Sequence, residues 1–223
     1  MSSSGKTQHF DCCIRRFESC RPSHTKTDLF RQVGFCMVHA ARTESSVGRK
    51  YDGEGVNAMC ADQMSLRFAV PADLDRICEV EAACFPAGEA APREVLAERL
   101  KAYAGSCWLL EDGEVLAALI NGMPTDEKDL LDGMYGSTGY YRENGRWMMI
   151  FGVDTAPAYR RRGCAARLMK RVIADAKAGG RAGVVLTCKE RLIPYYERFG
   201  FRNEGLSAST HGGETWYQMR LTF

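Results

Sequence analysis

The segment AYRRRGCAARLM, residues 158–169, combines residue types that can bind an anion. The first turn of a helix carries backbone N–H groups without intrahelical partners and the positive end of the helix dipole, so phosphate binds there when the backbone can come close. The glycine has no Cβ to obstruct that approach, and the three arginines add positive charge. The residues that would form this phosphate cradle are Arg160, Arg161, Arg162, Gly163, Cys164 and Ala165. The alternative is a charge run that simply faces water.

The pattern R-x-x-G-x-A differs from the nucleoside-triphosphate loop G-x-x-x-x-G-K-[ST] and from G-x-G-x-x-G. Its flanks predict the elements that position it. RWMMIFGV, residues 146–153, is nearly continuous in apolar residues, as is GVVLTC, residues 183–188, and such strands are usually buried on both faces. Between them, apolar residues at helical spacing mark one face of a helix that Gly179 and Gly180 end. Residues 147–188 therefore predict a strand, a helix and a parallel strand.

The rest of the chain after Met64 also alternates between the two kinds of element. SLRFAV has the alternation of a half-buried strand, and helical spacing follows in ADLDRICEVEAACF and APREVLAERLKAY. Asp112 and Gly113 join two apolar runs as a tight hairpin, and TWYQMRLTF predicts a final strand. These patterns predict an α/β or α+β fold with a mixed sheet.

The composition is that of an ordinary soluble protein. The chain has 223 residues, of which 45% are hydrophobic and 26% are charged, and its formal net charge is +2. It contains no run of 18 apolar residues, and its charge is near balance, so we expect neither a membrane nor a nucleic-acid partner. The first residues, MSSSGKTQHFDCC, lack the apolar stretch of a secretory signal. We therefore expect a cytoplasmic protein with reduced thiols.

Residues 1–63 differ from the rest of the sequence. They hold five of the ten cysteines and three of the four histidines, and they show no apolar periodicity. Cys20 with His24 and Cys36 with His39 could supply four zinc ligands, but the short C-x2–4-C spacing is missing. We favour a disordered extension, or translated sequence upstream of a start at Met64, and expect no metal. The predicted folded domain is residues 64–223.

VDTAPAYRRRGCAARLM resembles the acetyl-CoA-binding signature of the GNAT superfamily of N-acetyltransferases. A second segment, LTCKERLIPYYERFGF, is similar to the corresponding part of the arylalkylamine (serotonin) N-acetyltransferases. The resemblance extends in element order over residues 64–223. It implies the GNAT fold, with a mixed sheet of about six to seven strands in which two parallel strands splay apart.

The resemblance also implies how acetyl-CoA, the cosubstrate, would bind. The residues of the phosphate cradle would hold the pyrophosphate, largely through backbone N–H groups. Val153 and Thr155, at the end of the preceding strand, would pair their backbone with the pantetheine arm. The thioester would lie in the split between the strands of IFGVD and GVVLTC.

In this family the amine attacks the thioester directly. Tyr196 matches the tyrosine that acts as general acid in the arylalkylamine branch, where it protonates the departing sulfur. The alternative for Tyr196 is a packing role, and we expect that packing role for Tyr195. Vertebrate members carry histidines at positions that align with Met149 and Phe151, so that proton path is missing here.

Two residues are candidates for the general base. Glu89 follows a Phe-Pro turn, much as an acidic residue does in insect arylalkylamine enzymes, where it acts through water. Glu89 could instead sit near a helix start only because the helix dipole favours a carboxylate there. His211, in the loop STHGGETW, is the competitor, because imidazole titrates near neutrality.

The function predicted from these residues is transfer of the acetyl group from acetyl-CoA to a primary amine of a small molecule, by a monomer or homodimer. A protein or peptide acetyltransferase on the same fold is the alternative, and it would need an open groove. A third hypothesis is a catalytically weak acyl-CoA-binding module, or a module whose arginines contact nucleic-acid phosphates. From Met64 onward acidic residues balance basic ones, which gives the nucleic-acid version little support.

Overall fold

A computed structural model describes residues 64–223 of the chain. The strands are β1 (Ser65–Phe68), β2 (Cys107–Asp112), β3 (Val115–Thr125), β4 (Trp147–Thr155), β5 (Gly183–Cys188), β6 (Arg202–Leu206) and β7 (Tyr217–Thr222). The helices are α1 (Leu74–Cys84), α2 (Arg93–Tyr103), α3 (Gly133–Gly136), α4 (Cys164–Ala178) and α5 (Ile193–Glu197). The candidate zinc ligands and the N-terminal extension lie outside the described residues, so the hypotheses about them stay predictions.

The seven strands form one sheet in the order β1-β2-β3-β4-β5-β7-β6. β4 and β5 are parallel, and every other neighbouring pair is antiparallel. The helix α4 connects the parallel pair, which confirms the strand, helix and parallel strand predicted for residues 147–188. The predicted fold class, with a mixed sheet of six to seven strands, is also confirmed.

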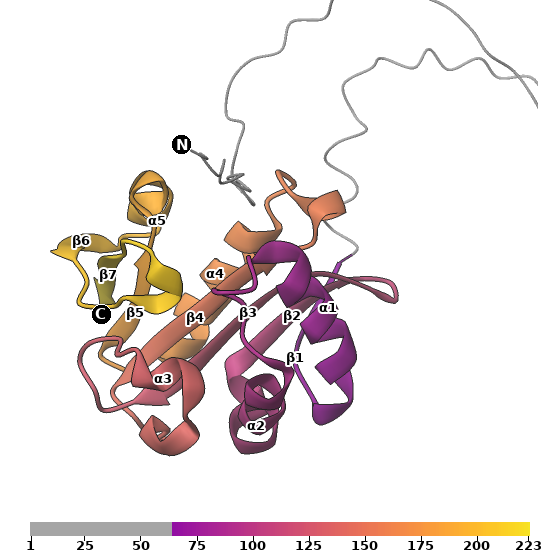
Figure 1. The fold of residues 1–223 in the computed structure, drawn as a ribbon, viewed down its shortest axis with the longest axis horizontal. Coiled ribbons are helices and arrows are strands. Elements are labelled where there is room, and N and C mark those ends of the chain that lie inside the picture. The colour runs from indigo at the N-terminus through magenta and orange to yellow at the C-terminus, as the bar shows by residue number, and fades with distance from the viewer. Residues whose placement is uncertain (1–63) are drawn as a thin grey trace, which may run out of the picture.

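Helices cover both faces of this sheet (Figure 1). On one face, α4 buries Leu168, Met169 and Val172 against apolar residues of β2 to β5. On the opposite face, α1 and α2 bury Ile77, Leu96 and other apolar side chains against β2 and β3. These are the faces that the helical spacing predicted, because apolar residues three and four apart lie on one side of a helix.

The parallel pairing of β4 with β5 is short. It runs from Trp147 opposite Gly183 to Ile150 opposite Leu186. Beyond that point β4 stays paired with β3 as far as Thr155, and β5 stays paired with β7 as far as Cys188. Because each strand keeps its outer partner while the two lose each other, the sheet has a split between β4 and β5. This is the splay that the resemblance implied.

A β-bulge lies where the split begins. The register of β3 with β4 shifts between Asn121 and Gly122, so that Asn121 faces Gly152 and Gly122 faces Ile150. Phe151 is the extra residue on β4. A bulge of this kind bends its strand and increases the local twist, and here it lies directly after the last residue of β4 that pairs with β5.

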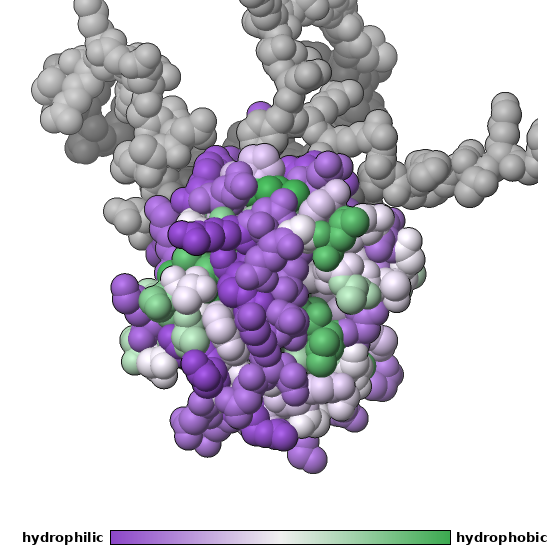
Figure 2. Space-filling view, turned by 90° about the vertical axis from the view of Figure 1, so that its left-hand side faces the viewer, coloured by the Kyte–Doolittle hydropathy of each residue, from purple (hydrophilic) through white to green (hydrophobic). Residues whose placement is uncertain are grey.

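Figure 2 shows the side of the molecule that faces left in Figure 1, where β6, β7 and α5 lie. Hydrophilic residues dominate this face, and its apolar residues are scattered in small separate groups. Among residues 64–223, no helix has both the length and the apolar composition needed to cross a bilayer.

Candidate active site

The start of α4 has the backbone geometry of an anion site. Gly163 precedes the helix with φ at +80°, and Arg161 also has a positive φ, +66°, which is uncommon for a residue with a side chain. A left-handed residue next to a right-handed one turns neighbouring backbone N–H groups toward one concave surface. A Cβ added at Gly163 would find no atom within 4 Å, so the space beside the helix start is open. The local backbone therefore suits a bound phosphate.

The three arginines of the cradle do not share one orientation. Arg161 and Arg162 are exposed, and the Arg162 guanidinium lies 5.1 Å from the centre of the Tyr159 ring. Arg160 turns back toward the body of the domain instead. Its Nε donates to the carbonyl of Thr155 at 3.3 Å, and its Nη2 donates to the carbonyl of Ala83 at 3.2 Å. Arg160 thus joins the end of β4 to the end of α1.

Val153 and Thr155 lie on β4 beyond the last pairing with β5, as the coenzyme role requires. The side chain of Val153 packs on the α4 face of the sheet. The carbonyl of Thr155 also accepts a hydrogen bond from Cys84 Sγ at 3.3 Å. Within the cradle itself, Cys164 is buried and its Sγ donates to the carbonyl of Tyr159 at 3.7 Å, while Ala165 is partly buried.

Tyr196 lies at the split on its α4 face. Its side chain belongs to the same apolar cluster as Cys188, the last residue of β5, and only 6% of Tyr196 is exposed. Burial raises the pKa of its phenol well above the ordinary value, and the neighbouring Cys188, Tyr195 and Asp154 raise it further. Tyr195 packs edge-on against Phe199 at 5.3 Å, and its buried hydroxyl has no hydrogen-bond partner.

The structure brings the two candidate bases together, although they are 122 residues apart in the chain. The ring Nε2 of His211 lies 3.1 Å from the carbonyl oxygen of Glu89. Gly212 makes this contact possible: it has φ at +64°, and a Cβ there would lie 2.7 Å from Cγ of Glu89. The loop between α1 and α2 therefore meets the loop between β6 and β7.

Lys189, which the sequence analysis did not single out, is the partner of Glu89. Its Nζ donates to Glu89 Oε1 at 2.7 Å, and it lies 3.5 Å from Glu214 Oε2 and 5.6 Å from the centre of the Trp216 ring. The Glu89 side chain is only 7% exposed. Lys189 follows β5 directly, and a charged residue at the end of a buried parallel strand is a signal that could have identified it.

Tyr135 was also missed, and it bridges the split on the face opposite Tyr196. Its ring lies 5.5 Å from that of Phe151 on β4, and its hydroxyl is 3.1 Å from the hydroxyl of Thr187 on β5. The imidazole of His211 stacks on the same ring at 4.0 Å, with 11° between the planes. The Tyr135 ring thus lies between His211 and the two strands that border the split, so His211 and Glu89 lie over the split.

The loop that carries Tyr135 is fixed to the loop that carries His211. Asp132, just before α3, accepts hydrogen bonds from the hydroxyls of Ser209 and Thr210 and from the backbone N–H of Thr210 at 3.0 Å. The segment between β3 and β4 contains one short α-helix, α3. Together the β3–β4 loop and the β6–β7 loop cover the split on the face opposite α4, and we call them the roof.

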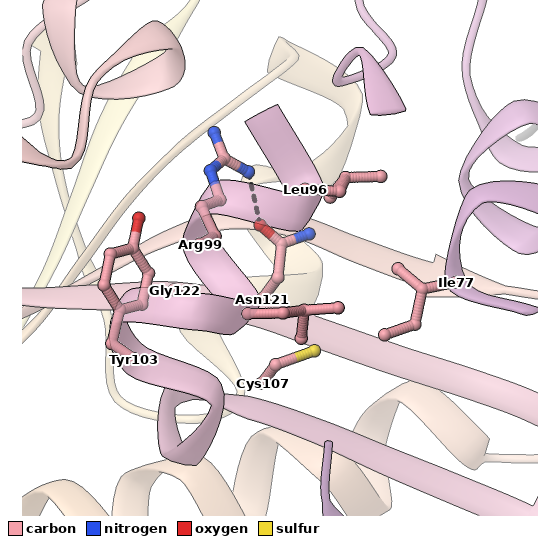
Figure 3. A pocket seen from close by; sticks show the side chains of 8 residues that line it. Ile77, Leu96, Arg99, Tyr103, Cys107, Asn121 and Gly122 are labelled. Atoms are coloured by element: carbon pink, nitrogen blue, oxygen red, sulfur yellow. Dashed lines mark hydrogen bonds between the residues drawn. The ribbon is translucent and has the colours of Figure 1, made fainter. Parts of the chain in front are cut away.

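Arg99 is a buried cation beneath this roof, with 5% of its surface exposed. Its Nη1 donates to Asn121 Oδ1 at 2.9 Å (Figure 3), and its Nη2 donates to the carbonyl of Tyr135 at 2.8 Å. Its guanidinium lies 4.4 Å from the centre of the Phe151 ring. The pocket beside Arg99 and Asn121 holds about 10 Å³, room for about one water. Arg99 therefore fixes the backbone of Tyr135 by a hydrogen bond and packs against the ring of Phe151.

The split between β4 and β5 opens beside the glycine-preceded start of α4, which is the arrangement that the resemblance to the GNAT acetyltransferases implied. The model of the acetyltransferase (GNAT) family matches residues 74–201, and the chain belongs to this family. Its assignment to the arylalkylamine branch stays a prediction.

Solved structures share the fold. The GNAT-like decarboxylase GphF in complex with isobutyryl-CoA is 19% identical, with a TM-score of 0.59, and the match covers 71% of this chain and 98% of that one. The loading GNATL domain of CurA from Lyngbya majuscula is 15% identical, with a TM-score of 0.63, over 71% and 97%. The ribosomal-protein-S18-alanine N-acetyltransferase from Escherichia coli is 18% identical, with a TM-score of 0.53, over 71% and 93%. At these identities the likeness concerns the fold alone.

Proposed function

We propose that this protein transfers the acetyl group of acetyl-CoA to a primary amine of a small molecule, and that the amine attacks the thioester directly. The observation that carries the proposal is the arrangement of the split. Tyr196 lies on one face of it, Tyr135 with His211 lies on the other, and the start of α4 follows the end of β4. A thioester in the split would have a proton donor on one side and a proton acceptor on the other.

The reaction forms a C–N bond, breaks the C–S bond and moves two protons. Tyr196 would donate its phenolic proton to the departing sulfur. A phenol is protonated at neutral pH, and burial places this proton donor in a site from which water is largely excluded. The proton lost by the attacking amine would pass to a base on the opposite face.

We propose His211 as this base, with Glu89 as its support. A carbonyl oxygen only accepts hydrogen bonds, so the contact with Glu89 places the proton of a neutral imidazole on Nε2 and leaves Nδ1 as the acceptor. Oε1 of the Glu89 carboxylate already accepts a hydrogen bond from Lys189 Nζ at 2.7 Å, so this oxygen is engaged by a cation and does not face an incoming amine alone. Glu89→Gln should therefore reduce kcat less than His211→Gln.

The roof over the split favours a small acceptor of the arylalkylamine type. The contact of His211 with Glu89 and the hydrogen bonds of Asp132 tie together the loops over the split, and loops tied in this way leave more room for a small amine than for a protein chain. The ring of Tyr135 and the indole of Trp216 offer aromatic surface at the same place. The Escherichia coli neighbour, by its name, acetylates an alanine of a ribosomal protein, so a peptide acceptor is the competing proposal.

A turnover screen tests the function. The enzyme is supplied with acetyl-CoA and, in turn, aryl alkylamines, polyamines, amino acids and short peptides, and release of the coenzyme A thiol is measured. We expect the highest kcat/KM with an aryl alkylamine. Turnover of peptides alone would favour the competing acceptor, and coenzyme binding without turnover of any amine would favour a binding module.

A further inference from the structure

Asp154 and Glu81 are two buried carboxyl groups that interact with each other between β4 and α1. Asp154 on β4 has 0% of its surface exposed, and Glu81 on α1 has 4%. Neither carboxyl oxygen of Asp154 has a hydrogen-bond donor among the described residues, and the same is true of Glu81 Oε2. A buried carboxylate without donors is costly, and two such groups in contact do not both ionise.

No cation among the described residues neutralises Asp154. The charged and titratable groups that act on it are Glu81 and Cys84 of α1 and Arg99 of α2, and it acts in turn on Cys107 of β2 and Tyr196 of α5. Arg99 is the one cation of this set, and its two terminal nitrogens are bonded to Asn121 and Tyr135.

This arrangement favours the protonated form of Asp154. Burial raises its pKa well above the usual range, and the nearby Glu81 carboxylate raises it further. A protonated Asp154 becomes a donor, and the oxygen of Glu81 that has no donor becomes its acceptor. One proton then satisfies both groups.

The pair joins two parts of the candidate active site. Asp154 stands between Val153 and Thr155, the residues predicted to hold the pantetheine arm. The other oxygen of Glu81, Oε1, accepts the backbone N–H of Ala91 at 2.9 Å, two residues after Glu89. Through Glu81, the strand of the coenzyme is connected to the loop that carries Glu89 and contacts His211.

We propose that Glu81 and Asp154 share one proton and act as a positioning pair, which sets the distance between β4 and the loop that carries Glu89. The proposal rests on the proposed function, because only an acyl transfer in the split makes that distance matter for the rate. Neither side chain is assigned contact with substrate.

Three variants test the positioning role: Asp154→Ala, Asp154→Asn and, as a matched control, Glu111→Ala. Glu111 is another buried carboxylate, paired with Arg67 and Arg76, on β2 near the far edge of the sheet. Asp154→Ala should lower kcat about 10- to 100-fold with little change in the KM for the amine, because a displacement of about 1 Å is enough for such a loss. Asp154→Asn restores a donor to Glu81 and should recover kcat to within about threefold. Glu111→Ala should lose stability and keep kcat.

The pH dependence supplies a second readout, and its stability arm does not require turnover. The raised pKa means that the native state holds the Asp154 proton, so the stability contributed by the pair is present at low pH and is lost as pH rises through the native pKa. The melting temperature of the wild type should therefore fall relative to that of Asp154→Asn as the pH rises above the range in which an ordinary aspartate titrates. If deprotonation of Asp154 lowers kcat at alkaline pH, that decrease should be smaller in Asp154→Asn. A decrease in kcat caused by deprotonation of Tyr196 would remain in this variant.

The outcomes separate this proposal from the proposed function. If no amine is acetylated but the melting temperatures diverge with pH as stated, the function fails and the shared proton stands. Parallel pH curves for the wild type and Asp154→Asn would overturn the shared proton. Full kcat in a folded Asp154→Ala protein would overturn the positioning role, as would equal losses in Asp154→Asn and Asp154→Ala. If Asp154→Ala does not fold, the melting temperatures of Asp154→Asn against pH still decide whether the proton is shared.

Discussion

At the residue scale, the glycine before α4 has a conformation that other residues adopt with strain. Gly163→Val should raise the dissociation constant of acetyl-CoA by about tenfold or more, equal to about 1.4 kcal/mol, because the side chain would fill the open space beside the helix start. Isothermal calorimetry measures this. Gly180→Val is the matched control: Gly180 also has a positive φ, +68°, and open surroundings, but it lies at the other end of α4. Equal weakening in both variants would contradict the phosphate cradle.

Tyr195 and Tyr196 are adjacent, so they allow a catalytic role and a packing role of a tyrosine to be compared. Tyr196→Phe should keep the ring contacts and the affinity for acetyl-CoA, while kcat falls about 10- to 1000-fold because proton donation to sulfur is lost. Tyr195→Phe should have little effect on kcat, since its buried hydroxyl has no partner to lose. Steady-state kinetics over a range of pH measures both. Intact kcat in Tyr196→Phe at every pH would return Tyr196 to a packing role.

At the scale of elements, the site depends on three loops held against one another over a split sheet. Asp132 fixes the loop of Tyr135 to the loop of His211, and Arg99 holds Tyr135 from below. Neither connection involves the start of α4, where the coenzyme phosphates are predicted to bind. The acceptor side and the coenzyme side of the split should therefore respond separately to mutation.

Asp132→Ala tests this separation. Loss of its hydrogen bonds to Ser209 and Thr210 should loosen the roof and raise the KM for the amine about 3- to 30-fold, while the dissociation constant of acetyl-CoA changes little. Asp126→Ala, in the same segment, contacts the backbone of Arg146 and serves as the control. A loss of coenzyme affinity as large as the rise in KM would show that the roof also supports the coenzyme side.

At the scale of the whole molecule, residues 64–223 supply the seven-stranded sheet and the helices packed on both of its faces. Met64 is itself part of the core, and its carbonyl accepts a hydrogen bond from Arg167 Nη2 at 2.8 Å. A protein that begins at Met64 should therefore fold, and should match the full chain in acetyl-CoA affinity and kcat. Circular dichroism, calorimetry and zinc analysis of both proteins measure this. Failure to fold, or stoichiometric zinc in the full chain, would show that residues 1–63 belong to the functional protein.

The sequence by itself was sufficient for the elements around the split and for the glycine that precedes α4. The β4-α4-β5 unit, the hairpin at Gly113 and the glycine before α4 were predicted because each depends on local physics: apolar periodicity, turn conformation and the unpaired N–H groups of a helix start. The resemblance to a known family supplied the split and Tyr196. The roles of the predicted site residues remain to be measured.

Only the tertiary structure decided what surrounds the reacting groups. Nothing local to Glu89 indicates that Lys189 will pair with it or that His211 will contact its carbonyl, because those partners come from loops about 100 residues further along the chain. Asp154 reads in sequence as a polar end to an apolar strand, and Tyr135 as part of a polar loop. Packing α1 against β4 buries Asp154 beside Glu81, and the bend of β4 at Phe151 opens the space that Tyr135 bridges. Burial and charge proximity arise from contacts between distant segments, so the chemistry of these groups is determined by the fold.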